Sequence, residues 1–254
     1  MMTSLSTLFH VQAASLAASD FSSLLTARDN GSWFSNKNLQ LLFWPYTLET
    51  ILMVAVSTFI TVVIGLPLGV YLAETRKGGV ISNPIVNKVV GIIVNLLRAV
   101  PFIIMAVIVL FAIRVIDFPW LPAIGWPAFT VALIVSAVPY FARMVESNIL
   151  SVEPGKIEAA QMMGASRLAI MSGVLVREAL PSIIQSITIL TITIIGYSAM
   201  ASAVGGGGLG ALAINYGYQR FQFDVIVITV AAILVLVQIV QMVGDMLSRL
   251  VDHR

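Results

Sequence analysis

The run Thr50–Ala73, TILMVAVSTFITVVIGLPLGVYLA, contains no charged residue and decides the fold class of the chain. A helix that crosses a bilayer needs roughly 20 mostly apolar residues. The rest of the sequence agrees, because 59% of the 254 residues are hydrophobic, 10% are charged and the mean hydropathy is +0.98. A soluble domain carries about 25% charged residues. The sequence therefore predicts an all-α integral membrane protein.

Four further apolar segments predict four more spans. They are Val89–Ile113, a segment from near Trp126 to Arg143, Ser182–Ala203 and Val225–Gly244. Lipid offers the backbone no hydrogen-bond partners, so each open-chain span must be a helix. Pro101 lies inside the second span and is expected to kink it. We therefore expect five transmembrane helices.

Lysine and arginine indicate the orientation, because they collect in short cytoplasmic loops. With five spans, ten of the 14 basic residues fall on one side and four on the other. This places the N-terminus outside and the C-terminus in the cytoplasm. We expect an extracytoplasmic or interfacial extension over residues 1–45, and a transmembrane domain over residues 46–251. The net charge of +2 is too small to suggest nucleic acid as a partner.

Three charged residues lie near or inside the predicted spans. Arg143 and Glu146 are three residues apart on a helix, so we expect them to pair at the inner boundary. Arg98 lies within the second span. Two interpretations of Arg98 are open: its side chain reaches the inner interface, which we favour, or it faces a protein interior or a cavity.

The connection of residues 150–180, between the third and fourth spans, is the longest expected on the cytoplasmic side. Glu153 and Pro154 favour a helix start, and Gly164 is well placed to stop that helix. Ser166 can cap a second helix over residues 167–179, and Pro181 is expected to separate it from the fourth span. The connection is thus predicted to form two short helices that meet at a glycine bend outside the membrane.

The first of these helices has features of a docking surface. Ala159 and Ala160 leave little side-chain bulk before the bend, and Glu158 supplies a charge that can anchor a partner. An ordinary pair of surface helices is equally compatible with the spacing alone.

The fourth span is the best candidate for lining a pathway, because it carries many hydroxyl groups among apolar neighbours. Met200 near its outer end is flexible enough to close a narrow hole against a symmetry mate. Alternatively, the small residues only promote tight packing. Gly205 to Gly208 follow this span and allow the backbone to turn sharply.

Several segments together resemble the permeases of bacterial ABC importers, and more closely the methionine importer subfamily. The general signature is Glu158-Ala159-Ala160, then Gly164, then Leu180-Pro181. The segments that favour the subfamily are Arg98-Ala99-Val100-Pro101-Phe102-Ile103, Ala142-Arg143-Met144-Val145-Glu146, Gly196-Tyr197-Ser198-Ala199-Met200 and Ala203-Val204-Gly205-Gly206-Gly207-Gly208-Leu209-Gly210. The resemblance covers about Tyr46 to Val251.

The resemblance implies a permease that imports methionine by alternating access in the bacterial inner membrane. Its partners would be lipid, a second copy of the chain, a cytoplasmic ATPase dimer that uses ATP and Mg²⁺, and an extracytoplasmic methionine-binding protein. The resemblance implies that Glu158, Ala159, Ala160 and Gly164 couple the chain to the ATPase. On the fourth span we expect Tyr197, Ser198 and Met200 to form the path or gate, and the prolines and glycines predict structural hinges at Pro101, Pro181, Gly205 and Gly208.

Other activities find little support in the sequence. A G-x-x-x-x-G-K-[ST] phosphate loop is missing, so the chain is not expected to hydrolyse ATP or to hold a cofactor. It has no cysteine, and its two histidines lie near opposite ends, so neither catalytic nor metal-binding residues are predicted. Two alternatives stay open: an ABC permease for another small polar solute, and a membrane enzyme or scaffold outside the ABC class.

Overall fold

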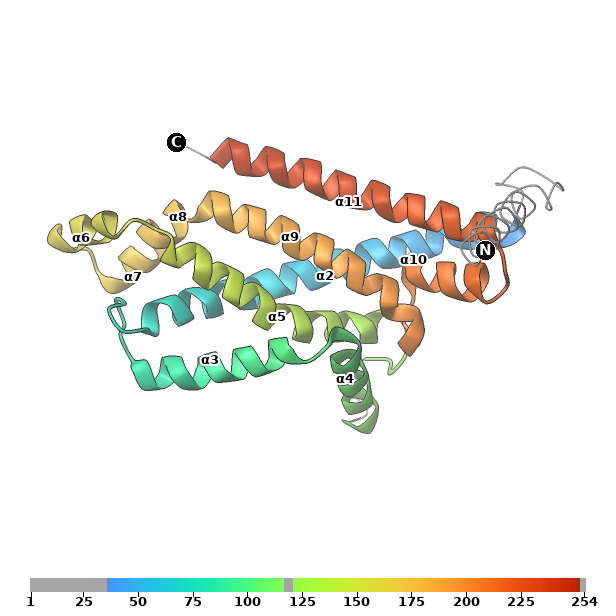
Figure 1. The fold of residues 1–254 in the computed structure, drawn as a ribbon, viewed down its shortest axis with the longest axis horizontal. Helices are drawn as coiled ribbons and strands as arrows, with labels where there is room; N and C mark the ends of the chain where they lie inside the picture. Colours follow the sequence, from blue (N-terminus) through green and yellow to red (C-terminus); the bar gives the residue numbers. More distant parts are fainter. Residues whose placement is uncertain (1–35, 117–120, 252–254) are drawn as a thin grey trace, which may run out of the picture. The chain divides into compact units, whose positions relative to one another are not determined.

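The computed structural model describes residues 36–116 and 121–251, and most of these residues are helical (Figure 1). The chain divides into two compact units, residues 1–41 and 42–254. The extension expected over residues 1–45 lies mostly outside the described residues. Its expected end falls inside the first described helix, α2, so the described part shows no break at residue 45.

Seven helices of eight or more residues make up most of the described chain. They are α2 (Lys37–Thr75), α3 (Pro84–Ala99), α4 (Phe102–Ile116), α5 (Trp126–Leu150), α6 (Pro154–Met162), α9 (Leu180–Ser198) and α11 (Phe223–Val251). Two composite segments connect them. The first contains α7 (Arg167–Ala169), a π-helix (Ile170–Leu175) and α8 (Val176–Glu178); the second contains a 3₁₀ helix (Ala199–Val204), α10 (Gly208–Ala211) and a π-helix (Leu212–Tyr218).

Four helices of the described chain are long and apolar enough to cross a membrane alone. They are α2, α5, α9 with its 3₁₀ continuation to Val204, and α11. A fifth span exists if α3 and α4 are counted as one broken crossing. The all-α membrane fold is therefore confirmed, as is the start of the third span at Trp126. Because 39 residues of helix extend about 58 Å, α2 is longer than the roughly 30 Å hydrocarbon core needs.

The second span is broken rather than kinked, which corrects the expectation for Pro101. The axes of α3 and α4 differ by 102° across the break. Val100 has extended backbone angles (φ −72°, ψ 126°), as expected for a residue that precedes proline. The carbonyl of Pro101 then accepts hydrogen bonds from the N–H groups of Ile104 and Met105 and starts a new helix. The segment that the sequence predicts as one helix therefore forms two helices.

Helix α5 forms the centre of the packing. Phe129, Leu133 and Phe141 on this helix are fully buried. Helix α2 approaches it closely at Gly69, where a methyl group in place of hydrogen would lie 2.6 Å from Val145 Cβ. In a bilayer the hydrophobic effect does not drive helices together, and small residues let the helix backbones approach closely enough for van der Waals packing. Helices α3 and α9 also pack on α5, and α11 packs on α9 (Figure 1).

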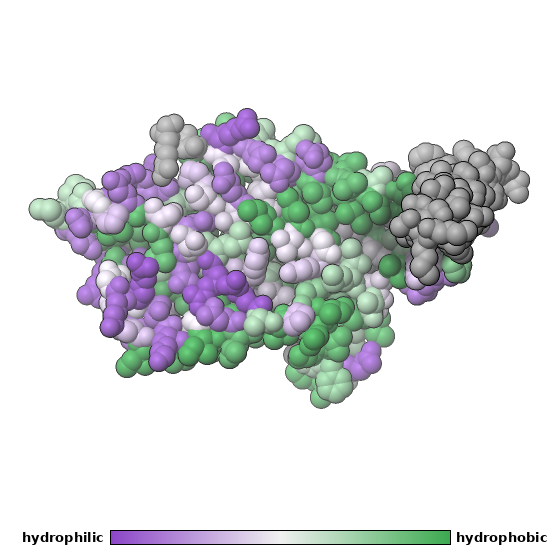
Figure 2. Space-filling model, viewed as in Figure 1, coloured by the Kyte–Doolittle hydropathy of each residue, from purple (hydrophilic) through white to green (hydrophobic). Residues whose placement is uncertain are grey.

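The surface separates into apolar and polar regions. Figure 2 shows hydrophobic residues over α4 and hydrophilic residues gathered at the end that carries α6 and α7. Large apolar side chains are exposed along α4 and α11, among them Ile108, Phe111, Leu234 and Ile239. Such exposure suits a lipid environment. The polar end, formed by residues 154–178, suits the aqueous side of a membrane.

Candidate functional site

The polar end is a helical hairpin of residues 154–178, and its first arm is built as the sequence predicts. Helix α6 begins at Pro154 after the N-cap Glu153 and ends at Met162. Gly164 follows with φ +78°, a conformation that glycine adopts without steric cost. The Ala165 N–H donates to the carbonyl of Ala160 across the bend. The predicted glycine bend is therefore present, and backbone geometry rather than crowding requires the glycine, because a Cβ there would meet nothing within 4 Å.

The second arm is partly as predicted. The Ser166 side chain accepts a hydrogen bond from the Ala169 N–H at 3.3 Å, which confirms the expected cap. The helix then widens into the π-helix of residues 170–175 and continues as α8. Only Ala179 separates α8 from α9. Pro181 lies in the first turn of α9, where its missing N–H has no intrahelical partner to lose. Contrary to expectation, Pro181 does not separate the hairpin from the fourth span.

Buried contacts and one ion pair hold the hairpin in place. Ala160, Ile170 and Leu175 are buried in the main apolar core together with residues of α5 and α9. Lys156 Nζ pairs with Glu178 Oε2 and joins α6 to α8. Exposed ion pairs of this kind contribute only about 0–1 kcal/mol, so the buried contacts carry most of the stability. The hairpin is thus a packed extension of the membrane domain.

The outer surface of the hairpin is apolar in part. Glu158 and Ala159 are exposed, but Ala160 is only 5% exposed, so a single alanine of the predicted pair is on the surface. Met162 and Met163 are 91% and 81% exposed. Sequence reasoning did not assign these methionines to the surface, although adjacent methionines before a bend are a usable signal. Adjacent exposed apolar side chains are typical of interaction surfaces.

At the opposite end of α9, aromatic rings surround the first gate candidate. Tyr197 stacks on Phe102 with the ring centroids 4.3 Å apart and the planes 3° from parallel. Phe102 in turn meets Phe129 edge-on at 5.7 Å. Since Phe102 is the first residue of α4, this stack fixes the start of α4 against the end of α9. Tyr197 is therefore held firmly in the protein.

The other two gate candidates lie in different environments. Ser198 is buried, and its hydroxyl donates to the carbonyl of Ile195 at 2.7 Å. Met200 is 47% exposed on the 3₁₀ helix that follows α9. The Ser198 side chain thus packs inside its own chain, whereas the Met200 side chain is available to a partner surface.

The glycine run after this 3₁₀ helix turns the chain back. Gly205 and Gly208 have φ values of +78° and +82°, which glycine adopts without steric cost; their hinge role stays a prediction. The Gly208 N–H donates to Glu49 Oε2 and the Leu209 N–H donates to Thr50 Oγ1, both at 2.8 Å. Sequence reasoning missed Glu49 and Thr50, because they lie 159 residues away and no local pattern links them to the glycines.

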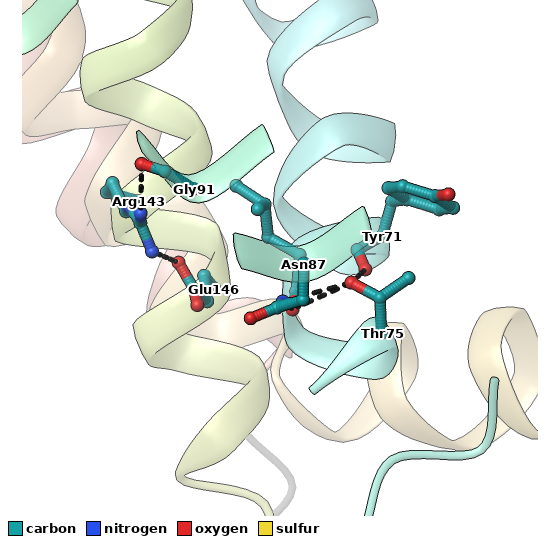
Figure 3. Close-up of polar contacts among 7 residues, drawn as sticks. Tyr71, Thr75, Asn87, Gly91, Arg143 and Glu146 are labelled. Carbon is teal, nitrogen blue, oxygen red and sulfur yellow. Dashed lines mark hydrogen bonds and ion pairs between the residues drawn. The ribbon is translucent and has the colours of Figure 1, made fainter. Parts of the chain in front are cut away.

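A polar cluster joins α2, α3 and α5 (Figure 3). Arg143 Nη1 pairs with Glu146 Oε2 at 2.5 Å, which confirms the predicted pair. Arg143 Nη2 also donates to the carbonyl of Gly91 on α3 at 2.9 Å. The Asn87 side-chain amide donates to the carbonyl of Leu72 at 2.7 Å, close to the end of α2. These bonds fix α3 to both neighbouring helices on one side of the break at Pro101.

Arg98 lies in the last turn of α3, and its side chain is exposed. Among the described residues, no side chain forms a hydrogen bond or ion pair with it. It follows Lys88 by ten residues, which is about 15 Å along a helix, or half the hydrocarbon thickness. Both interpretations of Arg98, a side chain that reaches the inner interface and one that faces protein or water, stay predictions.

Comparison with known proteins identifies the family. Residues 65–254 match the family described as "Binding-protein-dependent transport system inner membrane component". The chain belongs to this family. As a family member it is a multi-pass component of an inner membrane and not the ATPase of the transport system, in agreement with the sequence.

Relatives of this permease cover most of its length. It is 44% identical over 223 residues to the probable D-methionine transport system permease protein MetI of Vibrio cholerae, covering 87% of this chain and 96% of that protein. It is 45% identical over 152 residues to D-methionine transport system permease protein MetI of Escherichia coli K12, covering 60% of this chain and 69% of that protein.

Solved structures agree with the fold of this permease. A chain of the inward-facing MetNI methionine ABC transporter superposes with a TM-score of 0.82 and 40% identity, covering 86% of this chain and 100% of that one. A chain of an amino acid ABC transporter with histidines gives a TM-score of 0.68 at 21% identity, covering 87% and 99%. The second similarity concerns the fold alone.

The environment of Arg98 can be measured with single cysteines, since the natural chain contains none. We expect Arg98→Cys in lipid vesicles to react with a charged, membrane-impermeant thiol reagent at least about ten times faster than Leu96→Cys, because ionic reagents stay out of hydrocarbon. Leu96 is the matched control, as it lies on the same helix and is 64% exposed. Equal, slow reaction at both positions would place Arg98 in lipid.

Proposed function

We propose that this chain is the membrane permease of an ATP-driven importer of methionine in a bacterial inner membrane. The hairpin of residues 154–178 carries the transport assignment, because it presents a firmly packed, partly apolar surface outside the membrane and leads directly into a spanning helix. The relatives at 44% and 45% identity support methionine as the substrate, since both are named as D-methionine permeases.

The hairpin would bind a cytoplasmic ATPase. Exposed Met162 and Met163 offer an adaptable apolar contact beside the charge of Glu158. ATP and Mg²⁺ would act in that partner, and this chain would receive its movement. The surface required for docking includes Ala159 but not the side chain of Ala160, which is needed for the packing of the hairpin itself.

A second copy of the chain would complete the pathway. Helix α9 and its 3₁₀ continuation expose one stripe of residues at helical spacing: Ser182, Gln185, Ile189, Gly196 and Met200. Such a stripe of small, polar and flexible residues suits a path shared by two copies, because five helices are few for enclosing one. Symmetric dimers present the same surface to each other, so the two Met200 side chains would meet near the outer end, beside Tyr197.

Transport would then proceed by alternating access. With the N-terminus outside and the C-terminus inside, an extracytoplasmic binding protein would deliver methionine to the outer end. ATP binding would draw the two hairpins together, and α9 would transmit that motion to Met200. Pro101 and the glycines at 205 and 208 supply the points at which the helices can change direction.

The substrate assignment is tested with the whole complex in vesicles. The chain, its ATPase and binding protein loaded with methionine should give ATP-dependent uptake of radiolabelled methionine. The same complex with glutamine-loaded binding protein should give less uptake and less stimulation of ATP hydrolysis. Stimulation by a protein loaded with another small polar solute, and none by methionine, would reject methionine and keep the transport class.

The docking role of the hairpin is tested by Ala159→Trp. We expect methionine uptake to fall by at least about tenfold while the amount of inserted permease stays unchanged, because bulk on an exposed position blocks a close contact without entering the core. ATP hydrolysis and bound ATPase subunit are measured together with uptake. Ser172→Trp, exposed on the second arm, is the control; normal ATPase binding by Ala159→Trp would reject this surface.

The shared gate is tested by oxidative crosslinking of single cysteines. We expect Met200→Cys to crosslink two copies in the absence of ATP, since this side chain is exposed at the end of the stripe. Ser198→Cys should crosslink at least about ten times more slowly, because its position is buried and faces its own chain. Crosslinking of both at the same rate, or of neither, would remove Met200 from the gate.

A further inference from the structure

Glu49 and Thr50 on α2 hold the first residues of α10 by their side chains. The Gly208 N–H donates to Glu49 Oε2, and the Leu209 N–H donates to Thr50 Oγ1, each at 2.8 Å. Thr50 is buried, and its hydroxyl donates to the carbonyl of Tyr46 at 3.1 Å, so its oxygen is free to accept from Leu209. Together the two side chains satisfy two consecutive backbone amides that α10 itself leaves open.

The glycines explain why the two segments approach so closely. A methyl group on Gly207 would overlap Glu49 Oε2, and one on Gly208 would lie 2.7 Å from Thr50 Oγ1 and Met53 Cε. Gly208 also has a positive φ. Only hydrogen at these two positions leaves room for the carboxylate and hydroxyl to reach the backbone. The glycine run is therefore shaped to receive side chains of α2 as well as to turn the chain.

The same face of α2 makes another contact with the returning segment. Tyr46, three residues before Glu49, meets Tyr216 edge-on with the centroids 6.4 Å apart. The Arg220 guanidinium carbon lies 4.4 Å from the centre of the Tyr216 ring. Residues 208–218 are consequently attached to α2 at their start and near their end.

The attachment extends to Met200 through backbone contacts. A methyl group on Gly210 would overlap the backbone of Ala199, so α10 packs directly against the residue before Met200. The Gly206 N–H donates to the carbonyl of Ala201 at 2.7 Å, and the Gly125 N–H donates to the carbonyl of Gly205 at 3.0 Å. Every backbone segment around Met200 is therefore held, directly or through one neighbour, to α2 or to the start of α5.

We propose that Glu49 and Thr50 are positioning residues of the outer gate, which clamp the 208–209 backbone and so fix Met200 in its closed position. The clamp acts through two acceptor oxygens rather than through net charge, because its partners are neutral amides. It rests on the proposed gate at Met200 but not on the identity of the substrate. Loss of the clamp opens the region around residues 198–201 to water.

The experiment uses a reporter cysteine at Ser198 in the complete transporter in vesicles, with a membrane-impermeant thiol reagent added outside. In the otherwise unchanged chain labelling should be slow, because Ser198 is buried. Glu49→Leu, which removes the acceptor, should raise the rate at least about tenfold. Glu49→Gln, which keeps an acceptor oxygen without the charge, should leave it within about threefold. Thr50→Ala should also raise the labelling rate. Thr50→Ser, which keeps the hydroxyl, should leave labelling slow.

Leu52→Ala is the matched control, since Leu52 lies on α2 three residues after Glu49 and its side chain is 45% exposed; its labelling rate should stay slow. Melting temperatures of all variants are measured in parallel. If Glu49→Leu does not insert into the membrane, Thr50→Ala is used to test the clamp instead. The clamp is overturned if Glu49→Gln labels as fast as Glu49→Leu, or if both Glu49→Leu and Thr50→Ala label as slowly as Leu52→Ala. Failure of methionine uptake leaves this readout unaffected, so the two proposals fail separately.

Discussion

Within a bilayer every backbone N–H and C=O group must find its partner inside the protein, and the places where this chain departs from a regular helix are set by that requirement. At the end of the glycine run, the amides of Gly208 and Leu209 donate to Glu49 and Thr50. At Pro101, the residue that interrupts the span has no N–H to satisfy, and its carbonyl starts the next helix. The first interruption is thus satisfied by side chains of α2 and the second by the backbone of α4, and each lies where the chain changes direction.

Both departures lie at one end of α9, because Phe102 stacks on Tyr197 and the glycine turn follows the 3₁₀ helix. Helix α9 extends for 19 residues, or about 28 Å, from the hairpin to the 3₁₀ helix with Met200. Only the single turn residue Ala179 lies between α9 and the second arm. Because the hairpin is packed by Ala160, Ile170 and Leu175 into the same core as α9, a force on its surface reaches the spanning helix without a flexible linker.

Features with a local signal could be predicted from the sequence. Trp126 starts a helix, Gly164 ends one and Ser166 caps one, because each depends on backbone groups within four residues. The Arg143–Glu146 pair follows from helical spacing in the same way. The coupling role of the hairpin follows from the resemblance, whereas the gate role of Met200 follows from a flexible side chain near the end of a polar span.

Features that depend on packing between distant segments could not be predicted. Pro101 indicates a break, but the 102° angle accompanies the stack of Phe102 on Tyr197, which lies far along the chain. The burial of Ala160 and Ser198 depends on which face of each helix meets the core. The binding of Glu49 to Gly208 joins residues 159 positions apart and has no signature in either segment alone.

The central claim is that movement of the hairpin at one end of the protein changes the gate at the other. Its most direct test is a pair of distance measurements by pulsed electron paramagnetic resonance, with spin labels placed on two copies at Leu168 or, separately, at Met200. With ATP bound to a hydrolysis-deficient ATPase, the distance between the Leu168 labels should shorten and that between the Met200 labels should lengthen. A shorter hairpin distance with an unchanged gate distance would contradict the account.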